Sequence, residues 1–263
     1  MLLCGLQGET MASGPTSIIQ DEATHSLTNG INGNAGDQFE FNIIQSEQDK
    51  EDVVDFMQKH FRVQEPITRA LNCTEEDTRV FYDDLCNNGF NSGHSLIARH
   101  KGTSRLAGII LNAFYDQLPP SADATFEEKI QKEFYKEITE GQYPTVNANR
   151  LLTLIDLAER GVDKVIPPNE KVFKIDVLGV HPDFAGKGLG SILVNRSLQL
   201  SRSLGCEYAY TCASAKASAH IFKKFGFRSV RTIPYDEFLE NGQPVYRNLH
   251  DGGTGISLMV LKL

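Results

Sequence analysis

The sequence predicts an α/β (α+β) fold, with a central mixed, mostly antiparallel twisted sheet flanked by helices. Three observations carry this prediction. Short runs with apolar alternation, such as Phe39–Ile44, predict strands, and segments with helical periodicity, such as 46–61, separate them. Around Phe173–Leu200, a strand-like run, a glycine-rich turn and an amphipathic helix follow one another. Strands that alternate with helices in this way indicate a sheet covered by helices.

Composition divides the chain into a tail and one domain. Residues 1–38 are rich in Gly, Ser, Thr, Asn and Gln and have little apolar periodicity, so we expect a disordered N-terminal tail. Residues 39–263 carry the patterned segments, and a hydrophobic content of 40% in 263 residues is ample for a core. The formal charge of −8 argues against a nucleic-acid partner.

Cysteine, histidine and hydropathy patterns narrow the class further. Five cysteines without a CxxC pair favour reduced thiols in a cytoplasmic protein over a disulfide framework. The histidines are scattered without HxxxH spacing, so we expect no metal site. No apolar run reaches the roughly 18 residues that a membrane span needs, so we expect no membrane association. We expect a monomer.

The first half of the domain is expected to contain strands and helices in alternation. After the strand Phe39–Ile44, Ser46 opens a helix, and a second helix runs from Ile67 to about Leu85, ended by Asn87-Asn88-Gly89. Two further runs, 95–99 and 106–114, predict a hairpin. The remaining expected elements are helices around 126–140 and 147–160, the strand 173–180, the helix after the glycine turn, strand 208–211, helix 215–225, and strands 228–233 and 256–262.

The glycine turn Ala185–Gly190 is typical of an anion-binding loop. It lies between a strand and a helix, and the first N–H groups of a helix lack partners and carry partial positive charge. Gly188 follows Gly186-Lys187, so the turn lacks the GK[ST] ending of a P-loop, and it also lacks GxGxxG spacing. The expected ligand of this loop is a pyrophosphate group.

This turn resembles the (Q/R)xxGx(G/A) acyl-coenzyme A loop of the GNAT superfamily of N-acetyltransferases, and Ala219–Phe227 resembles that superfamily's closing helix with its KxGF ending. The resemblance implies the GNAT fold, with a splayed strand pair at the acyl-CoA site, and acetyl-CoA as cosubstrate without a metal. Ala185 stands where the family has Gln or Arg, and we expect Lys187 to supply the charge. The coenzyme residues that it implies are Leu178, Gly179 and Val180 on the central strand, with a bulge tolerated at Gly179, and Ala185, Gly186, Lys187, Gly188, Leu189 and Gly190 in the loop.

Three further segments resemble the insect-type arylalkylamine N-acetyltransferases, which acetylate amines such as dopamine, tyramine, octopamine and serotonin. These are Phe61–Ile67 (FRVQEPI), Cys212–Ala219 (CASAKASA) and Gly255–Met259 (GISLM). The resemblance implies Glu65 as the general base, and Ser214 and Ser218 as a serine pair that assists proton transfer. Phe222 stands where the wider superfamily often has the Tyr that protonates the thiolate.

Each assignment has a simpler alternative. Glu65 before a proline is also typical of a first-turn acid that complements a helix dipole, and Ser214 is a good helix cap. No Cys stands where an acyl-enzyme nucleophile is expected, which favours direct attack by the amine. The sequence therefore predicts an acetyl-CoA-dependent arylalkylamine N-acetyltransferase. An acetyltransferase of polyamines or protein amines, and a non-catalytic acyl-CoA-binding module, remain as alternatives.

Overall fold

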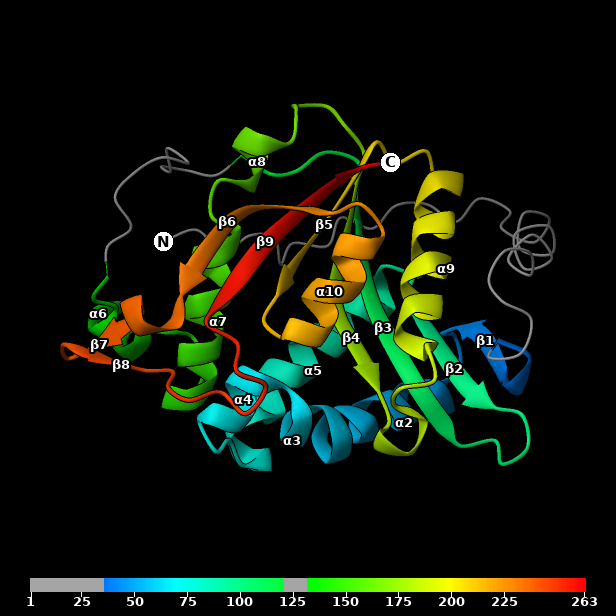
Figure 1. The fold of residues 1–263 in the computed structure, drawn as a ribbon, viewed down its shortest axis with the longest axis horizontal. Coiled ribbons are helices and arrows are strands. Elements are labelled where there is room, and N and C mark those ends of the chain that lie inside the picture. The colour runs from blue at the N-terminus through cyan, green and yellow to red at the C-terminus, as the bar shows by residue number, and fades with distance from the viewer. Residues whose placement is uncertain (1–35, 121–131) are drawn as a thin grey trace.

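The computed structural model describes residues 36–120 and 132–263, which form one central sheet with helices on both faces (Figure 1). The sheet has seven strands in the order β1-β2-β3-β4-β5-β9-β6, and the pairing is antiparallel everywhere except between β4 and β5. The strands are β1 (Phe39–Ile43), β2 (Leu96–His100), β3 (Leu106–Tyr115), β4 (Val172–Val180), β5 (Tyr208–Ala213), β6 (Arg228–Pro234) and β9 (Gly255–Lys262). The predicted mixed, mostly antiparallel sheet is confirmed.

Two helix layers cover the sheet. Helices α9 (Leu189–Ser203) and α10 (Lys216–Lys224) pack on one face, over a core that includes Phe173, Leu193 and Met259. Helices α5 (Glu75–Asn91) and α7 (Val146–Glu159) pack on the other face, over a core that includes Phe81, Leu154 and Ile256. The shorter helices are α2 (Glu47–Phe56), α3 (Arg62–Gln64), α4 (Pro66–Ala70), α6 (Tyr135–Thr139) and α8 (Val162–Val165).

The helix expected from Ile67 to about Leu85 starts within one residue of its predicted position, but it is interrupted and ends later than expected. It is broken into α4 and α5, because Asn72 takes a positive φ of 51° and Thr74 then starts a new helix with a capping box to Asp77. Helix α5 also runs through Gly89, which the sequence suggested as its end. A Cβ on Gly89 would lie 3.0–3.2 Å from Ser95 and Leu111, so this glycine permits close packing of the helix on β3.

Other expected elements occur close to their predicted bounds. The hairpin of β2 and β3 and helix α7 are confirmed, and Ser46 caps α2 by accepting from the Asp49 N–H. Residues 126–131 of the helix expected at 126–140 lie outside the described residues, as does all of 121–131, and the described remainder of that helix holds only the short α6. The expected tail likewise lies outside them up to residue 35. A small hairpin of β7 (Leu239–Glu240) and β8 (Gln243–Pro244) was not expected.

The central feature of the sheet is a fork between β4 and β5. The two strands pair in parallel from Val172 with Tyr208 up to Ile175 with Thr211, and the pairing then stops although both strands continue. From Val177 to Val180, β4 is paired only with β3, so its β5-facing edge has no strand partner. A hydrogen bond of 2.8 Å from the Thr211 hydroxyl to the Ile175 carbonyl closes the base of the fork.

The β-bulge of β4 lies at Asp176, not at Gly179 as expected. Leu111 and Asn112 of β3 face Val177 and Ile175, so Asp176 is the extra residue, whereas Gly179 pairs regularly with Ile109. Gly179 has another function in the packing. A Cβ there would lie 2.9 Å from the Phe56 ring and 3.2 Å from Ile109, so the missing side chain lets α2 pack on the strand.

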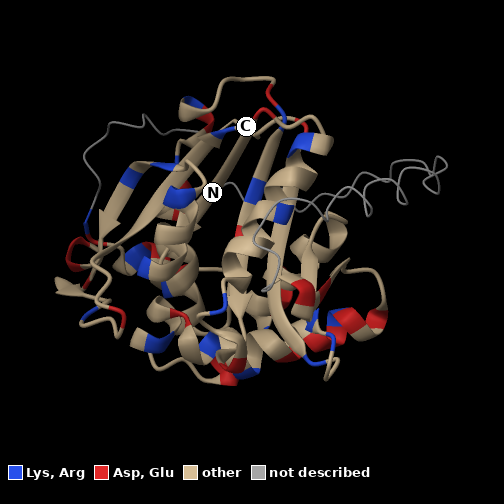
Figure 2. Cartoon of the chain, turned by 45° about the vertical axis from the view of Figure 1, so that its right-hand side comes forward, with Lys and Arg blue, Asp and Glu red and all other residues tan. Residues whose placement is uncertain are grey.

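Charge is unevenly spread over the described surface. Acidic residues gather on α2, whose sequence is EQDKEDVVDF, whereas basic and acidic residues mix over most of the remaining surface (Figure 2). Arg99 of β2 bridges Asp49 and Asp52 of this helix at 2.7 and 2.6 Å, which fastens α2 to the sheet. No helix in the described segments is both long and apolar enough to cross a membrane.

Candidate active site

A cavity of about 260 Å³ opens where β4 and β5 part. Its walls come from four regions that are distant in sequence: the segment from the end of α2 to the start of α4, the end of β4 with the following loop and the start of α9, the end of β5, and α10 with the residues just before it. Among its lining residues are all three predicted catalytic residues, Glu65, Ser214 and Ser218, and five of the nine predicted coenzyme residues, which are Leu178, Gly179, Val180, Ala185 and Gly190. Gly186, Lys187, Gly188 and Leu189 lie outside its wall, in or just after the loop.

Glu65 is held in place by the backbone of the helix that it begins. It is the N-cap of α4, and Pro66 at the first helical position fixes the backbone of that turn. Its carboxylate accepts four hydrogen bonds: Oε1 from the Ile67 N–H (3.2 Å) and the Ser214 hydroxyl (2.7 Å), and Oε2 from the Thr68 N–H (2.7 Å) and hydroxyl (2.6 Å). Glu65 therefore does cap a helix, as the simpler alternative proposed. Capping alone, however, does not require the contact with Ser214.

Ser214 lies between β5 and α10 rather than inside the helix. The N-cap of α10 is Ala215, and Asp251 accepts the hydrogen bond of the Lys216 N–H at 2.9 Å, so the expectation that Ser214 caps this helix is wrong. The carbonyl of Ser214 accepts a hydrogen bond of 2.8 Å from the Tyr235 hydroxyl. Ser214 is thus fixed at both its backbone and its side chain, with its hydroxyl directed at Glu65.

Ser218 lies in the first turn of α10. Its hydroxyl donates to the Ala215 carbonyl at 3.0 Å, which leaves the oxygen lone pairs available toward the cavity that it lines. Phe222, one turn further, lines the same cavity and packs edge-on against Phe227. The two serines are therefore brought to one cavity, but from a loop and a helix rather than from one helical face.

The glycine loop has the geometry of an open anion site. Gly186 and Gly188 take φ values of 73° and 77°, and a Cβ on either residue would meet nothing within 4 Å. Gly188 is the N-cap of the fifteen-residue helix α9, so the free N–H groups of that helix face the loop. Lys187 lies over the Phe184 ring, with Nζ 5.2 Å from its centroid. Together with the unpaired edge of β4, the loop could hold the diphosphate and the amide chain of a coenzyme A molecule.

The comparisons with known proteins agree with this fold. The model of the acetyltransferase (GNAT) family matches residues 111–227, which span β4, the loop and α10. Arylalkylamine N-acetyltransferase 2 from Aedes aegypti has a similar structure, with a TM-score of 0.65 and 22% identity over 85% of this chain and 98% of that chain. The fold of this protein is that of the GNAT acetyltransferases.

Two further proteins are similar to this chain, one in structure and one in part of its sequence. The polyamine N-acetyltransferase of Drosophila melanogaster, an enzyme that catalyses the formation of N-acetylagmatine, has a TM-score of 0.62 and 19% identity over 85% of this chain and 100% of that chain. An uncharacterized N-acetyltransferase of Bacillus subtilis (strain 168), CgeE, is 26% identical over 149 residues, which are 54% of each protein. The chain thus spans about half the length of that curated relative.

The candidate site contains residues that the sequence did not single out. Thr68 bonds Glu65 and lies 3.1 Å from the Tyr82 hydroxyl. Asp176 and Cys212 line the cavity at the base of the fork. A signal for Asp176 was present, because Lys174 and Asp176 are two charged residues at alternate positions of an otherwise apolar strand.

Cys212 is the cysteine that lines the cavity in the described part of the chain. Burial, with Glu159 nearby, raises the pKa of its thiol well above the usual value, so the thiol stays neutral and is a poor nucleophile. The described cysteines are Cys73, Cys86, Cys206 and Cys212, and all four are free. Within residues 36–120 and 132–263, no group of three or more His, Cys, Asp or Glu side chains could hold a metal ion.

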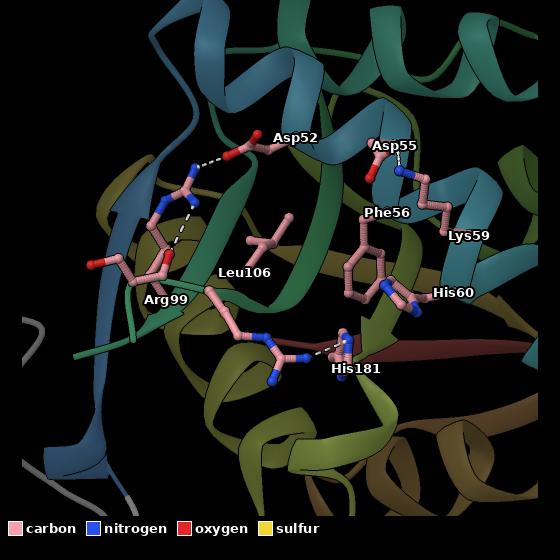
Figure 3. A pocket seen from close by; sticks show the side chains of 10 residues that line it. Asp52, Asp55, Phe56, Lys59, His60, Arg99, Leu106 and His181 are labelled. Atoms are coloured by element: carbon pink, nitrogen blue, oxygen red, sulfur yellow. Dashed lines mark hydrogen bonds and ion pairs between the residues drawn. The ribbon is translucent and has the colours of Figure 1, made fainter. Parts of the chain in front are cut away.

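A second, larger pocket of about 500 Å³ lies beside α2, on the other side of Phe56, whose ring belongs to both walls (Figure 3). Its charged side chains are paired with one another or with neighbours, as in Asp55 with Lys59 at 2.6 Å. The rings of His60 and His181 lie 4.1 Å apart. This pocket contains none of the predicted catalytic residues.

Proposed function

We propose that this protein is an acetyl-CoA-dependent N-acetyltransferase that acts on a small primary amine by direct attack. The observation that carries the proposal is the meeting of Glu65 and Ser214, which are far apart in sequence, at the unpaired edge of β4. The sequence resemblance favours an arylalkylamine of the dopamine, tyramine, octopamine or serotonin type as the acceptor, and the similarity to an arylalkylamine N-acetyltransferase in fold agrees with that choice.

The proposed reaction breaks the carbon–sulfur bond of acetyl-CoA and forms a carbon–nitrogen bond to the amine. The amine nitrogen loses one proton and the departing sulfur gains one. Backbone N–H groups at the free edge of β4, in Leu178–Val180, are the candidates to stabilise the negative charge on the carbonyl oxygen, because they have no partner on β5.

The route of the amine proton follows from the hydrogen bonds of Glu65. Two donors on each carboxylate oxygen fill the roughly four acceptor positions that a carboxylate has. Of these donors, Ser214 is the one that also lines the cavity. We therefore assign Ser214 to take the amine proton on its oxygen while it passes its own proton to Glu65 Oε1. Ser218, on the α10 side, is assigned to relay a proton from water to the thiolate: it gives its own proton to the sulfur and takes one from water, so that the serine ends neutral.

A second acceptor class, the polyamines, is favoured by one observation: Asp176 places another carboxylate on the cavity wall. Protein amines are a third class. The alternative that is not an enzyme is a non-catalytic acyl-CoA-binding module. Ala185 and Phe222 suggest it, because each stands where the superfamily often has a functional side chain.

Release of free thiol from acetyl-CoA, measured with a panel of tyramine, a diamine and a lysine peptide, separates these functions. An N-acetyltransferase of small amines releases thiol only with its amine acceptor and forms one acetylamide per thiol. A binding module would bind acetyl-CoA in calorimetry without amine-dependent thiol release, and this result would overturn the proposal. Release with the peptide alone would reassign the acceptor to protein amines.

A further inference from the structure

A small cluster of charges lies beneath the cavity, and the proposed proton route does not use it. Lys174 Nζ is 2.8 Å from Asp176 Oδ1 and 2.8 Å from Glu159 Oε1, so one lysine of β4 joins the bulge of its own strand to helix α7. The three side chains are 15%, 9% and 20% exposed. Charges this deep are retained only with partners, because removing them from water costs several kcal/mol each.

The cluster has two carboxylates for one ammonium group. Burial opposes the charge of Lys174, but the carboxylates of Asp176 and Glu159 hold its pKa well above the usual value, so the lysine is charged. Burial raises the pKa of Glu159, and burial together with Glu159 raises the pKa of the neighbouring Asp156 to about 6. The cluster therefore carries either surplus negative charge or an extra proton. A second cation would balance the surplus negative charge, or would displace the extra proton.

The bulge brings one of these carboxylates to the cavity. Asp176 is the residue of β4 without a partner on β3, and it lines the cavity wall together with Cys212, Glu65 and Ser214. Lys174 and Glu159 do not line that wall, and Lys174 joins Asp176 to Glu159. The cavity thus contains two carboxylates with different surroundings: Glu65 with four donors, and Asp176 with Lys174 as its ion-pair partner in the described part of the chain.

We propose that Asp176 binds a second positively charged group of the acceptor, so that a diamine or a guanidino-amine is preferred to a monoamine of the same length. This inference rests on the proposed function, and it moves the acceptor from the arylalkylamines toward dications. A cation beside Asp176 balances the excess negative charge of the cluster, whereas a neutral ring or methyl group in its place leaves two carboxylates to share the single ammonium group of Lys174. Sites that bond a polar group reject analogues lacking it far more strongly than apolar pockets do.

A matched pair of amines tests the preference. Pentylamine and 1,5-diaminopentane have the same carbon chain and differ in the second ammonium group. Calorimetry of each amine with the CoA-saturated protein is expected to show at least about tenfold tighter binding of the diamine, equal to about 1.4 kcal/mol. Equal affinity of the two amines for the wild-type protein would overturn the inference without any variant.

Variants then assign the preference to a residue. Asp176→Asn should lower the affinity for the diamine to that for pentylamine and change pentylamine binding by less than about threefold. Asp176→Glu keeps the charge and should keep the preference, which a purely structural role of the ion pair does not require. Asp55→Asn is the matched control, because Asp55 is also paired with a lysine but lies in the other pocket, and it should leave both affinities unchanged. If Asp176→Asn lowers the affinity for both amines equally, the cluster only stabilises the structure and does not bind a second cation.

Acetyl transfer to the same two amines separates this inference from the proposed function. Equal kcat/KM for both amines would uphold the acetyltransferase and remove the cation site. Binding of the diamine that depends on Asp176 without any acetyl transfer would uphold the cation site and remove the acetyltransferase.

Discussion

The two pockets on either side of Phe56 differ in the way their polar groups are held. The larger, beside α2, is lined by exposed or half-exposed charges that pair within one helix or with the adjacent hairpin, such as Lys59 with Asp55 and Arg99 with Asp52. The smaller pocket, in the fork of the sheet, is lined by residues from segments that are far apart in the sequence. Its Glu65 is only 9% exposed and fully hydrogen-bonded.

This difference shows that volume is a poor guide to chemistry. Surface ion pairs are worth little and are screened by salt, so the charges of the larger pocket define no fixed field. In the fork, burial strengthens each polar interaction and the unpaired edge of β4 offers backbone donors. Substitutions in the fork should therefore change catalysis, and equivalent substitutions beside α2 should not.

The largest effect is expected for Glu65→Gln. Gln keeps the size of the side chain but cannot take up the proton that Ser214 passes on, so turnover should fall about 10²-fold at neutral pH. The deficit should shrink as the pH approaches about 10, where alkylamines lose their proton unaided. A pH–rate profile that keeps its acidic limb in the variant would reduce Glu65 to a helix cap.

Gly188→Val tests the loop above the fork. A side chain there occupies the space where a diphosphate would lie, and the dissociation constant of acetyl-CoA should rise at least about tenfold, or about 1.4 kcal/mol. Because the φ of Gly188 is 77°, valine also strains the backbone, and Gly205→Val is the control: Gly205 follows the other end of α9 with a φ of 73° and similar open space. Similar loss of affinity in both variants would assign the effect to strain.

Ser218→Ala tests the assignment of the thiolate proton. Turnover should fall about tenfold with little change in acetyl-CoA affinity, because the interaction matters mainly as charge develops on sulfur. Phe222→Tyr on this background should restore part of the rate, since Phe222 lines the same cavity one turn away. Weaker coenzyme binding with unchanged turnover would make Ser218 a binding contact.

A smaller effect is expected from His60 in the larger pocket. Burial first, and then the charge of the adjacent His181, lower the pKa of His60 below 6.5, with Lys59 and Arg105 adding to the repulsion and Asp55 opposing it. The pKa of His181 is also lowered, mainly by burial, against the attraction of Asp183. The neutral pair is therefore most stable above pH 6.5, and stability is lost as the pH falls through the lowered values.

Thermal unfolding between about pH 7.5 and pH 5 measures this effect. The Tm of the wild-type protein should fall below pH 6.5, and that of His60→Asn should fall less, while turnover at pH 7.5 stays the same. Parallel curves for the two proteins would show that His60 does not carry the acid sensitivity.

The smallest effect is expected for Lys59→Met. Lys59 is 62% exposed, and its ion-pair partner among the described residues is Asp55, one turn before it on the same side of the helix, so both Tm and kcat/KM should match the wild type. A clear loss of kcat/KM here, with Tm unchanged, would show that the larger pocket takes part in the reaction and would erase the contrast with the fork.

The sequence by itself determined most of the fold and the order of the motifs. Alternating runs gave the strands within a residue or two, because side-chain periodicity is a local property of the backbone. The glycine loop was also predictable from the sequence. Glycines at positions 186 and 188 permit positive φ values, and a helix follows directly. The helix at 67–85 failed because Asn72 and the packing of Gly89 on β3 overrode local propensity.

Only the tertiary structure decided how the candidate site is assembled. No local pattern indicates that the Ser214 hydroxyl lies 2.7 Å from Glu65, because 149 residues separate them and the contact depends on the fork between β4 and β5. The position of the bulge at Asp176 was set by pairing with β3, not by the glycine three residues later. The pairing of Lys174 with Glu159 likewise exists only because α7 packs on that face of the sheet. Periodicity is encoded in neighbouring residues, whereas hydrogen-bond partners and buried charges are selected by the packing of whole elements.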